Sequence, residues 1–585
     1  TLESFYRDRG YLKFSIESSQ ISLSRDKKLI FITFNVNEGE KYTINDVDVV
    51  GEIPFDEDVY IDIINRLKDT TYSQAQITSI EEFFTNVLGN RGYAFAEVIG
   101  NPEINENTNE VKLIFSVQPG NRTYTRKILF TGNDITQDHV LRREMRQFEG
   151  AWTSDNSIEA GKVRLERLGY FKEVNVETIP VPGTEDQIDI VYSVEEETTG
   201  SVGGNIGYSD FGLMLGFNLQ EQNFLGTGNT VGIGINKNIY SEMYNISYMN
   251  PYATRDAVSL GYNIFFRETD YGEFNVANYL TNSNGFGAQF GYPISDISRL
   301  GFNITYDKTD IDIGTLPARE IYDFVSVEGN IFETLTAQLS WQQVTLNRGL
   351  FPTDGASTVV SLSSTIPGSD LSYYRFNIRQ RYYQPLSSDF VFGFQGEIGY
   401  LDSYGDTKEI PFFQNFYAGG PRSLRGFESN TLGPRSTDAP CYEFNYEEGT
   451  CPNLIDTDGD GEPDAPYLNP YANQGQRSRY RDAPIGGNIK VEGSLQLIFR
   501  LPFIEDQRSL RSAFFFDFGN VFSDNCKEYQ INCSELSADE LRYSYGVGVT
   551  WITGFGPMSL AIAKPTNAGP LERTEEFQFT VGNVF

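Results

Sequence analysis

The stretch Val258-Ser259-Leu260-Gly261-Tyr262-Asn263-Ile264-Phe265-Phe266-Arg267 decides the fold, because apolar and polar side chains alternate along it. One face of an extended chain would carry Val258, Leu260, Tyr262, Ile264 and Phe266, and the other would carry Ser259, Gly261, Asn263 and Arg267. Successive side chains of a β-strand point to opposite faces, so this period of two predicts a strand with one apolar and one polar face. The same alternation recurs from about residue 200 to the C-terminus, which predicts a long series of such strands.

Composition indicates what kind of β-protein this is. The 585 residues are 14% aromatic and include 55 glycines, and the formal net charge is -34. No run of eighteen apolar residues could form a transmembrane helix, so a membrane-spanning chain with this pattern would cross as a barrel. About 385 residues at roughly 24 per strand and its loops predict a transmembrane antiparallel β-barrel of about 16 strands. A soluble β-sandwich also alternates, but it seldom needs so many aromatic residues and glycines at strand ends.

The acidic balance and the missing motifs exclude other classes of function. With 80 acidic against 46 basic residues, we expect no nucleic-acid partner, because phosphates require a basic surface. We also predict that the chain is not an enzyme. The single histidine, His139, lies in the repeat region, so no Ser-His-Asp arrangement is available in the barrel, and no P-loop or dinucleotide fingerprint is present.

The first third of the chain contains a repeat of about eighty residues. Gly-Tyr recurs at Gly10-Tyr11, Gly92-Tyr93 and Gly169-Tyr170. In each full copy one strand precedes two helices and two further strands, which predicts small α+β units of order β-α-α-β-β. Because the chain begins abruptly inside such a unit, we expect a fragment or a mature product of a longer protein. The expected domains are the C-terminal part of a unit at 1–39, full units at 40–119 and 120–197, and a barrel at 198–585 with a long loop at about 418–484.

The four cysteines form two local pairs, Cys441 with Cys451 and Cys526 with Cys533. Each pair closes a short polar segment, whereas zinc sites usually combine tighter C-x-x-C spacing with histidine. We therefore predict two local disulfides and an oxidising compartment.

An acidic segment in the long loop resembles a calcium loop, because its carboxylates recur at alternate positions beside glycine. These residues are Asp456, Asp458, Asp460 and Asp464. The twelfth position from Asp456 is Tyr467, where an EF-hand needs glutamate, so the segment is not an EF-hand. A weak extracellular cation site and an acidic solvated turn both remain open, and no cofactor is expected.

The long loop opens with Gly419-Gly420-Pro421-Arg422-Ser423-Leu424-Arg425-Gly426-Phe427. If this loop folds back into a wet lumen, its glycines permit close backbone approach and an arginine can bind an inward carboxylate in a bidentate manner. The alternative is a mobile surface loop with a chance basic pair.

These features together resemble the BamA family of outer-membrane β-barrel assembly proteins, within the wider superfamily of POTRA-plus-barrel transporters. The β-α-α-β-β unit is similar to the polypeptide-transport-associated (POTRA) domain. Leu424-Arg425-Gly426-Phe427 is similar to the (V/L)-R-G-(F/Y) element of the family's sixth extracellular loop. Further similar segments follow in the family's order at residues 199–201, 223–228, 250–252, 486–488, 516–522 and in the final strand, which ends on Phe585. The resemblance covers essentially the whole chain.

The resemblance implies that Arg425 reaches into the lumen and pairs with Asp517. A second acidic position of the family falls on Gln496, which is a departure from the family pattern, and Glu492 on the same strand is the alternative source of that charge. The implied role of Arg425 is structural and conformational rather than catalytic.

The resemblance also implies a function: POTRA domains receive unfolded outer-membrane protein precursors, and the barrel opens laterally between its first and last strands. Both strands are poor in packing side chains, so we predict a weakly paired seam. The seam residues are Ser201, Gly203, Gly204, Gly207, Phe577, Phe579, Gly582 and Phe585. Implied partners are the precursors, accessory assembly lipoproteins, periplasmic chaperones and outer-membrane lipid. The implied location is the bacterial outer membrane, with the POTRA domains in the periplasm.

A second function shares the same domains. A POTRA-barrel secretion transporter, for two-partner secretion or autotransporter assembly, would translocate a dedicated passenger. The number of repeats in the uncut chain would discriminate between the two, whereas a passive porin would share only the barrel.

Overall fold

The computed structural model describes residues 2–582, except for residues 25–27, 210–211, 272–275, 278, 314–317, 438–482, 502–508, 531 and 554–555. The chain divides into two compact units. The first comprises residues 1–199 together with 225–227, and the second comprises the other residues from 200 onward.

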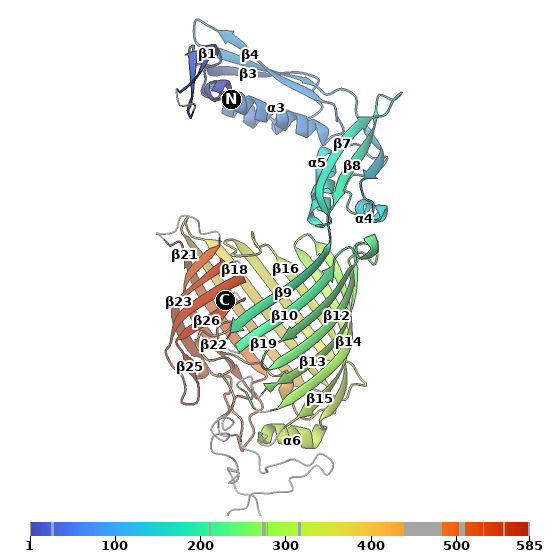
Figure 1. Ribbon diagram of the computed structural model, residues 1–585, viewed down its shortest axis with the longest axis vertical. Coiled ribbons are helices and arrows are strands. Elements are labelled where there is room, and N and C mark those ends of the chain that lie inside the picture. Colours follow the sequence, from blue (N-terminus) through green and yellow to red (C-terminus); the bar gives the residue numbers. More distant parts are fainter. Residues whose placement is uncertain are drawn as a thin grey trace, which may run out of the picture. The chain divides into compact units, whose positions relative to one another are not determined.

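The first unit consists of small α+β repeats (Figure 1). The N-terminal copy contributes α1 (Leu2–Arg7) and a two-stranded sheet of β1 (Ser15–Leu23) and β2 (Ile30–Asn37). The next copy runs β3 (Thr43–Gly51), α2 (Ile61–Leu67), α3 (Gln74–Gly89), β4 (Glu97–Asn105) and β5 (Glu110–Gln118), and the third runs β6 (Tyr124–Thr131), α4 (Asp138–Arg142), α5 (Asp155–Arg167), β7 (Phe171–Pro180) and β8 (Gln187–Glu196). Both complete copies form mixed sheets with the last strand in the centre, in the orders β3-β5-β4 and β6-β8-β7. The predicted β-α-α-β-β order is confirmed.

Helix α3 packs on its sheet through one apolar face. Ser73 caps its N-terminus, accepting a hydrogen bond from the Gln76 N–H, and Ile77, Phe84 and Leu88 are completely buried. Strand β5 buries every second residue from Val111 to Val117 against them. Each such side chain contributes roughly 1.5–3 kcal/mol by leaving water.

The Gly-Tyr motifs mark the joints between repeats. Gly10 and Gly92 have φ angles of +98° and +99°, which side chains other than glycine's rarely adopt. Their carbonyl oxygens accept hydrogen bonds from the N–H groups of Tyr42 and Thr123, at 2.9 and 2.7 Å. Each glycine therefore turns the chain so that it meets the start of the next repeat.

The second unit is a closed antiparallel barrel of 16 strands (Figure 1), as predicted. Its wall consists of β9 (Gly200–Ser209), β10 (Gly212–Glu221), β11 (Thr230–Lys237), β12 (Ser241–Asn250), β13 (Ser259–Asp270), β14 (Leu280–Ser295), β15 (Ser298–Asp312), β16 (Ile331–Val344), β17 (Gly355–Thr365), β18 (Tyr373–Pro385), β19 (Phe390–Ser403), β21 (Ile489–Phe499), β22 (Leu510–Phe522), β23 (Arg542–Thr553), β24 (Gly556–Pro565) and β26 (Phe577–Val581). Strand β20 (Gly426–Phe427) pairs with β25 (Thr574–Glu575) outside this ladder, and α6 (Arg319–Glu328) lies between β15 and β16.

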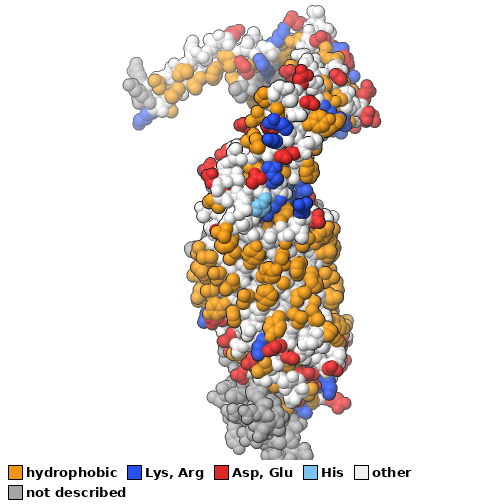
Figure 2. Space-filling model, turned by 90° about the vertical axis from the view of Figure 1, so that its right-hand side faces the viewer, with side chains coloured by type: hydrophobic (Ala, Val, Ile, Leu, Met, Phe, Trp, Pro, Cys, Tyr) orange, Lys and Arg blue, Asp and Glu red, His pale blue; other side chains and the backbone are white. Residues whose placement is uncertain are grey.

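The outer face of the barrel is apolar. Along β13, the alternate residues Tyr262, Ile264 and Phe266 are exposed, and the Tyr262 ring stacks between those of Tyr248 and Phe286 on the neighbouring strands. Figure 2 shows a band of hydrophobic side chains over the barrel strands. Within the described part of the chain, no helix has the length and hydropathy needed to cross a bilayer. On a closed barrel, an apolar outer band of this kind is the lipid-facing surface.

Ile264→Lys should lower the free energy of unfolding by about 2–4 kcal/mol, because it places a charge on the lipid-facing surface. Urea-driven unfolding in phospholipid vesicles measures the change. Asn263→Lys is the matched control, since the preceding residue points into the lumen and a charge there remains hydrated. Equal losses in both variants would contradict the assignment of the two faces.

Candidate functional site

The loop that follows β19 is anchored in the barrel by a buried ion pair. Arg425 Nε donates to Asp517 Oδ2 and Nη2 donates to Oδ1, both at 2.7 Å. The backbone N–H of Arg425 also donates to Asp517 Oδ2, at 3.2 Å. Asp517 on β22 is fully buried and Arg425 is 5% exposed. The contact is thus a bidentate pair shielded from bulk water, the geometry in which a guanidinium binds a carboxylate most specifically.

Two further side chains complete the surroundings of the guanidinium. Arg425 Nη2 donates to Ser494 Oγ on β21 at 2.9 Å, and Arg425 Cζ lies 3.5 Å from the centroid of the Phe515 ring. The cation therefore has a hydrogen-bonded carboxylate, a hydroxyl acceptor and an aromatic face as neighbours. Such partners offset the cost of moving the charge out of water.

The backbone around Arg425 can adopt this position only because Gly426 follows it. Gly426 has a φ of +91°, and a Cβ built there would lie 3.1 Å from the Ala563 side chain. The neighbouring Leu424 and Phe427 are completely buried in the hydrophobic cluster at this end of the barrel. All four residues of the predicted loop motif are therefore inside the protein, and the alternative of a mobile surface loop does not describe them.

Glu492 and Gln496, the other expected partners of Arg425, make different contacts. Glu492 accepts a hydrogen bond from Ser423 Oγ at 2.5 Å and forms an ion pair with Lys490 at 3.1 Å. Gln496 Nε2 donates to Ser494 Oγ at 3.3 Å. Glu492 thus binds the loop at Ser423, two residues before Arg425, rather than pairing with Arg425 itself. Gln496 is linked to Arg425 through their shared hydrogen-bond partner, Ser494. The sequence reasoning missed Ser494, although it shares the inward face of β21 with Glu492 and Gln496.

The same loop is hydrogen-bonded to the last strand of the barrel. Gly426 and Phe427 pair with Glu575 and Thr574, as β20 with β25. Gly426 N–H donates to Gln578 Oε1 at 3.3 Å, and Gln578 Nε2 donates to the Phe427 carbonyl oxygen at 2.8 Å. The sequence reasoning missed Gln578; its only signal was a polar side chain between the apolar Phe577 and Phe579.

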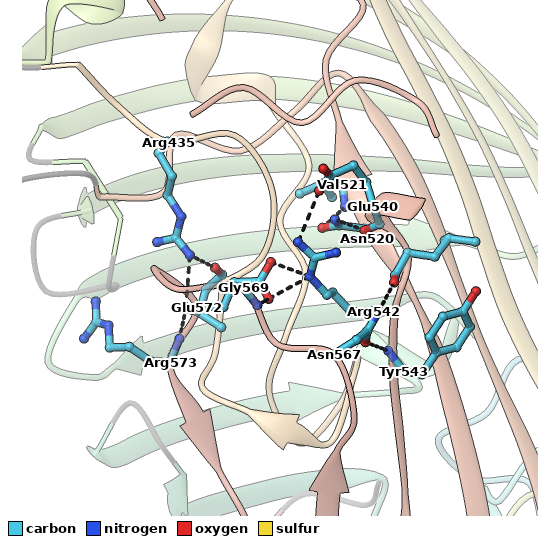
Figure 3. A network of polar contacts seen from close by, with 12 residues as sticks. Arg435, Asn520, Val521, Glu540, Arg542, Tyr543, Asn567, Gly569, Glu572 and Arg573 are labelled. Carbon is cyan, nitrogen blue, oxygen red and sulfur yellow. Dashed lines mark hydrogen bonds and ion pairs between the residues drawn. The ribbon is translucent and has the colours of Figure 1, made fainter. Parts of the chain in front are cut away.

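A polar network joins the loops at this end of the barrel (Figure 3). Arg542 at the start of β23 binds the carboxylate of Glu572 at 2.7 Å and that of Glu540 at 3.1 Å. Arg573 N–H donates to Thr431 Oγ1 at 2.9 Å, and the Arg573 guanidinium lies 3.3 Å from Glu428. The connection between β24 and β25 is therefore tied both to the β22–β23 loop and to the loop that carries Arg425.

Between the first and last strands of the barrel, the described residues form one ladder pair. Strand β9 pairs with β10 along its whole length, from Gly200 to Ser209. On its other side, among the described residues, it pairs with β26 only at Tyr208 and Val581. The predicted seam residues Ser201, Gly203, Gly204 and Gly207 all lie on β9, and the chain beyond Gly582 lies outside the described residues. Phe577 and Phe579 lie on β26, Gly582 follows it, and Phe585 is outside the described residues.

Two other predicted features fall partly or wholly outside the described residues. Cys526 and Cys533 form a disulfide in the β22–β23 loop, as predicted. Cys441, Cys451 and the acidic residues Asp456, Asp458, Asp460 and Asp464 all lie within residues 438–482, which the structure does not describe. In the described ranges, no group of three or more His, Cys, Asp or Glu residues is placed to hold a metal ion.

Helix α6 is joined to the end of the described part of the long loop. Both carboxylate oxygens of Glu320 accept hydrogen bonds from the Thr437 N–H, at 3.1 and 3.0 Å. Arg319 N–H donates to the Thr437 carbonyl oxygen at 2.7 Å. Burial raises the pKa of Glu320 to about 7, although the Thr437 N–H favours the charged form.

The fold and the site define a class, a POTRA-barrel protein of the outer membrane. The Omp85 superfamily domain matches residues 223–585, which is more than half of the chain. The POTRA family, described as a surface antigen variable number repeat, matches residues 1–39, 42–120 and 123–197. The chain belongs to the Omp85 superfamily, in the group formed by the outer-membrane protein assembly factor BamA and its relatives.

The relatives support this placement. BamA of Neisseria meningitidis serogroup B is 30% identical over 99% of this chain and 72% of the relative, and BamA of Buchnera aphidicola is 31% identical over 57% and 56%. The crystal structure of BamA from Haemophilus ducreyi lacking POTRA domains 1–3 is 30% identical, covers 92% of this chain and 99% of that one, and superimposes with a TM-score of 0.75. The protein is accordingly one of the bacterial outer membrane, with its POTRA domains in the periplasm.

Arg425→Ala should lower the free energy of unfolding of the barrel by about 3–5 kcal/mol, because it leaves the Asp517 carboxylate buried and unpaired. The double variant Arg425→Met with Asp517→Leu should lose less than the sum of its two single variants. Urea unfolding in vesicles, followed by the heat-dependent mobility of the folded barrel on gels, measures the free energy of unfolding of the parent and the four variants. Strictly additive losses would show that the two side chains are not energetically coupled.

The free energy of unfolding should fall as the pH rises from about 5 to 7. The pKa of Glu320 in the native state, about 7, exceeds the ordinary value of 4.5, so the native state binds the additional proton in this range. Glu320→Gln should remove roughly 3 kcal/mol of this pH dependence, since each pKa unit corresponds to about 1.4 kcal/mol. Urea unfolding at pH 5 and pH 8 tests the difference between the parent and the variant. A variant with the parent's pH dependence would contradict the role of Glu320.

Proposed function

We propose that this chain assembles and inserts β-barrel proteins into the bacterial outer membrane. In this proposal the POTRA repeats receive unfolded precursors from the periplasm, and the barrel opens laterally between β9 and β26. The observation that carries the proposal is the seam, where only Tyr208 and Val581 pair among the described residues.

The edge of β9 offers a template for an incoming strand. Between Gly200 and Gly207, every second residue directs its N–H and C=O groups away from β10, toward the β26 side, where the described ladder has only the pair of Tyr208 with Val581. An unpaired edge adds an extended segment through backbone hydrogen bonds, which are independent of side-chain identity. A single protein can therefore accept precursors of many different sequences.

The POTRA sheets offer edges of the same kind. Strands β3 and β4 border one sheet, and β6 and β7 border the other. An extended precursor can add to such an edge before it reaches the barrel. Accessory assembly lipoproteins and periplasmic chaperones would meet the chain on these periplasmic repeats, and outer-membrane lipid would contact the apolar band of the barrel.

The proposed activity requires binding and membrane mechanics rather than covalent catalysis. A precursor strand in lipid must pair all of its backbone polar groups, so its transfer from the seam into its own closed barrel is downhill. No nucleotide is needed to drive the reaction in this scheme.

A cross-link across the seam tests the proposal directly. Liposomes containing the parent chain should accelerate the folding of a urea-unfolded, unrelated outer-membrane barrel. Tyr208→Cys with Val581→Cys, oxidised to a disulfide, should reduce the rate toward that of protein-free liposomes, and a reductant should restore it. The parent treated with the same reductant controls for loss of the Cys526–Cys533 disulfide, and Tyr208→Cys alone controls for the substitution.

Two outcomes would contradict the proposal. Acceleration that persists in the cross-linked protein would show that insertion does not use the seam. No acceleration by the parent, together with ion conductance across the same membranes, would favour a secretion pore.

A further inference from the structure

The last strand of the barrel is divided between two partners. Residues 577–581 of β26 pair with β24, and the Glu576 carbonyl oxygen continues this ladder by accepting from the Ala563 N–H at 2.8 Å. The two preceding residues, Thr574 and Glu575, pair instead with β20 of the loop that carries Arg425. The strand that forms one edge of the seam is thus held at its start by a loop from inside the barrel.

Gln578 joins these two parts. Its amide accepts from Gly426 N–H and donates to the Phe427 carbonyl oxygen, and the side chain is 1% exposed. A buried amide that loses either bond leaves a polar group unsatisfied, which costs about 1–3 kcal/mol. Because Gly426 directly follows Arg425, Gln578 connects β26 to the buried pair of Arg425 and Asp517.

The next inward-facing residue of β26 makes no such connection. Thr580 is 2% exposed, and its hydroxyl has no hydrogen-bond partner within the described residues. Gln578 and Thr580 lie two residues apart on one face of one strand, so they share burial and strand position. They differ in whether the side chain binds the loop.

For the opposite edge of the seam, the described contacts include no comparable bond to a loop inside the barrel. Over the described residues of β9, the ladder runs only to β10, apart from the single pair of Tyr208 with Val581. Its side-chain hydrogen bond from Ser201 Oγ also goes to β10, at the Gln220 carbonyl oxygen. One edge of the seam is therefore fastened to the interior of the barrel, whereas the described hydrogen bonds of the other edge go to the barrel wall.

We propose that Gln578 is a positioning residue that fastens β26 to the Arg425 loop and so holds one edge of the seam in place. The importance of the seam rests on the proposed function, but the restraint on β26 does not. Loss of the Gln578 amide should loosen β26 relative to the barrel wall and leave β9 unchanged.

Distances between spin labels on the lipid face measure this restraint without any assembly assay. One label pair joins Phe577→Cys on β26 to Leu339→Cys on β16, and a second joins Ile206→Cys on β9 to the same Leu339→Cys. All three native side chains are exposed on the barrel surface. The protein without introduced cysteines is labelled in parallel to correct for its native cysteines.

Gln578→Leu should broaden the distance distribution of the β26 pair and leave that of the β9 pair unchanged. Thr580→Val, the matched control, should change neither. Gln578→Glu keeps an acceptor for Gly426 N–H but loses the donor to Phe427, so it should broaden the β26 pair to a smaller extent. Arg425→Ala should reproduce the effect of Gln578→Leu, because it releases the loop itself.

Three results would overturn the proposal. These are an unchanged β26 pair in folded Gln578→Leu, equal broadening of both pairs, and a Thr580→Val effect as large as that of Gln578→Leu. If Gln578→Leu does not fold, as judged by heat-dependent gel mobility, Gln578→Glu decides the question by the same criteria. The distance measurement does not depend on insertion activity. A chain that fails to accelerate barrel folding would refute the proposed function, but the role of Gln578 would still be decided by the measured distances.

Discussion

Backbone hydrogen bonding in lipid is the constraint on which the barrel depends. Every N–H and C=O group in the hydrocarbon region needs a partner, so a sheet that crosses the membrane must close on itself. In this protein fifteen of the strand junctions are paired ladders, and the closing junction between β26 and β9 has a single described pair. In the proposed function, this closing junction is the place where the edge of β9 receives a substrate strand.

The last strand of the barrel has restraints besides the wall ladder. The loop after β19 supplies them from inside, through the pair of Arg425 with Asp517 and through the pairing of β20 with β25. The polar network of Arg542 and Glu572 adds a second connection at the loop end of the barrel. These contacts are made by side chains and a short backbone pair rather than by the wall ladder.

The buried ion pair suits an anchoring role better than a purely stabilising one. Removing two charges from water is costly, and apolar residues of similar volume often stabilise a protein as well or better. The bidentate geometry, however, fixes the position and orientation of the loop backbone on both sides of Arg425. In this protein the following residue, Gly426, takes part in both the β20–β25 pair and the bond to Gln578. The position of the loop backbone thus directly restrains the position of the last strand.

The sequence by itself determined the class of fold, because alternation along β13 and its fellow strands is a local property of the chain. The order of helices and strands in the repeats could be predicted for the same reason. The periods of their apolar residues and the glycines between successive repeats are also local features of the sequence. The likeness of the loop motif to a known family pointed to Arg425 and Asp517 together. Only the tertiary structure decided that Ser494 accepts from Arg425, that Glu492 binds Ser423, and that Gln578 binds the loop. These contacts depend on strand register and on the path of a loop through the lumen, which join residues up to 152 positions apart and leave no periodic signal in the sequence.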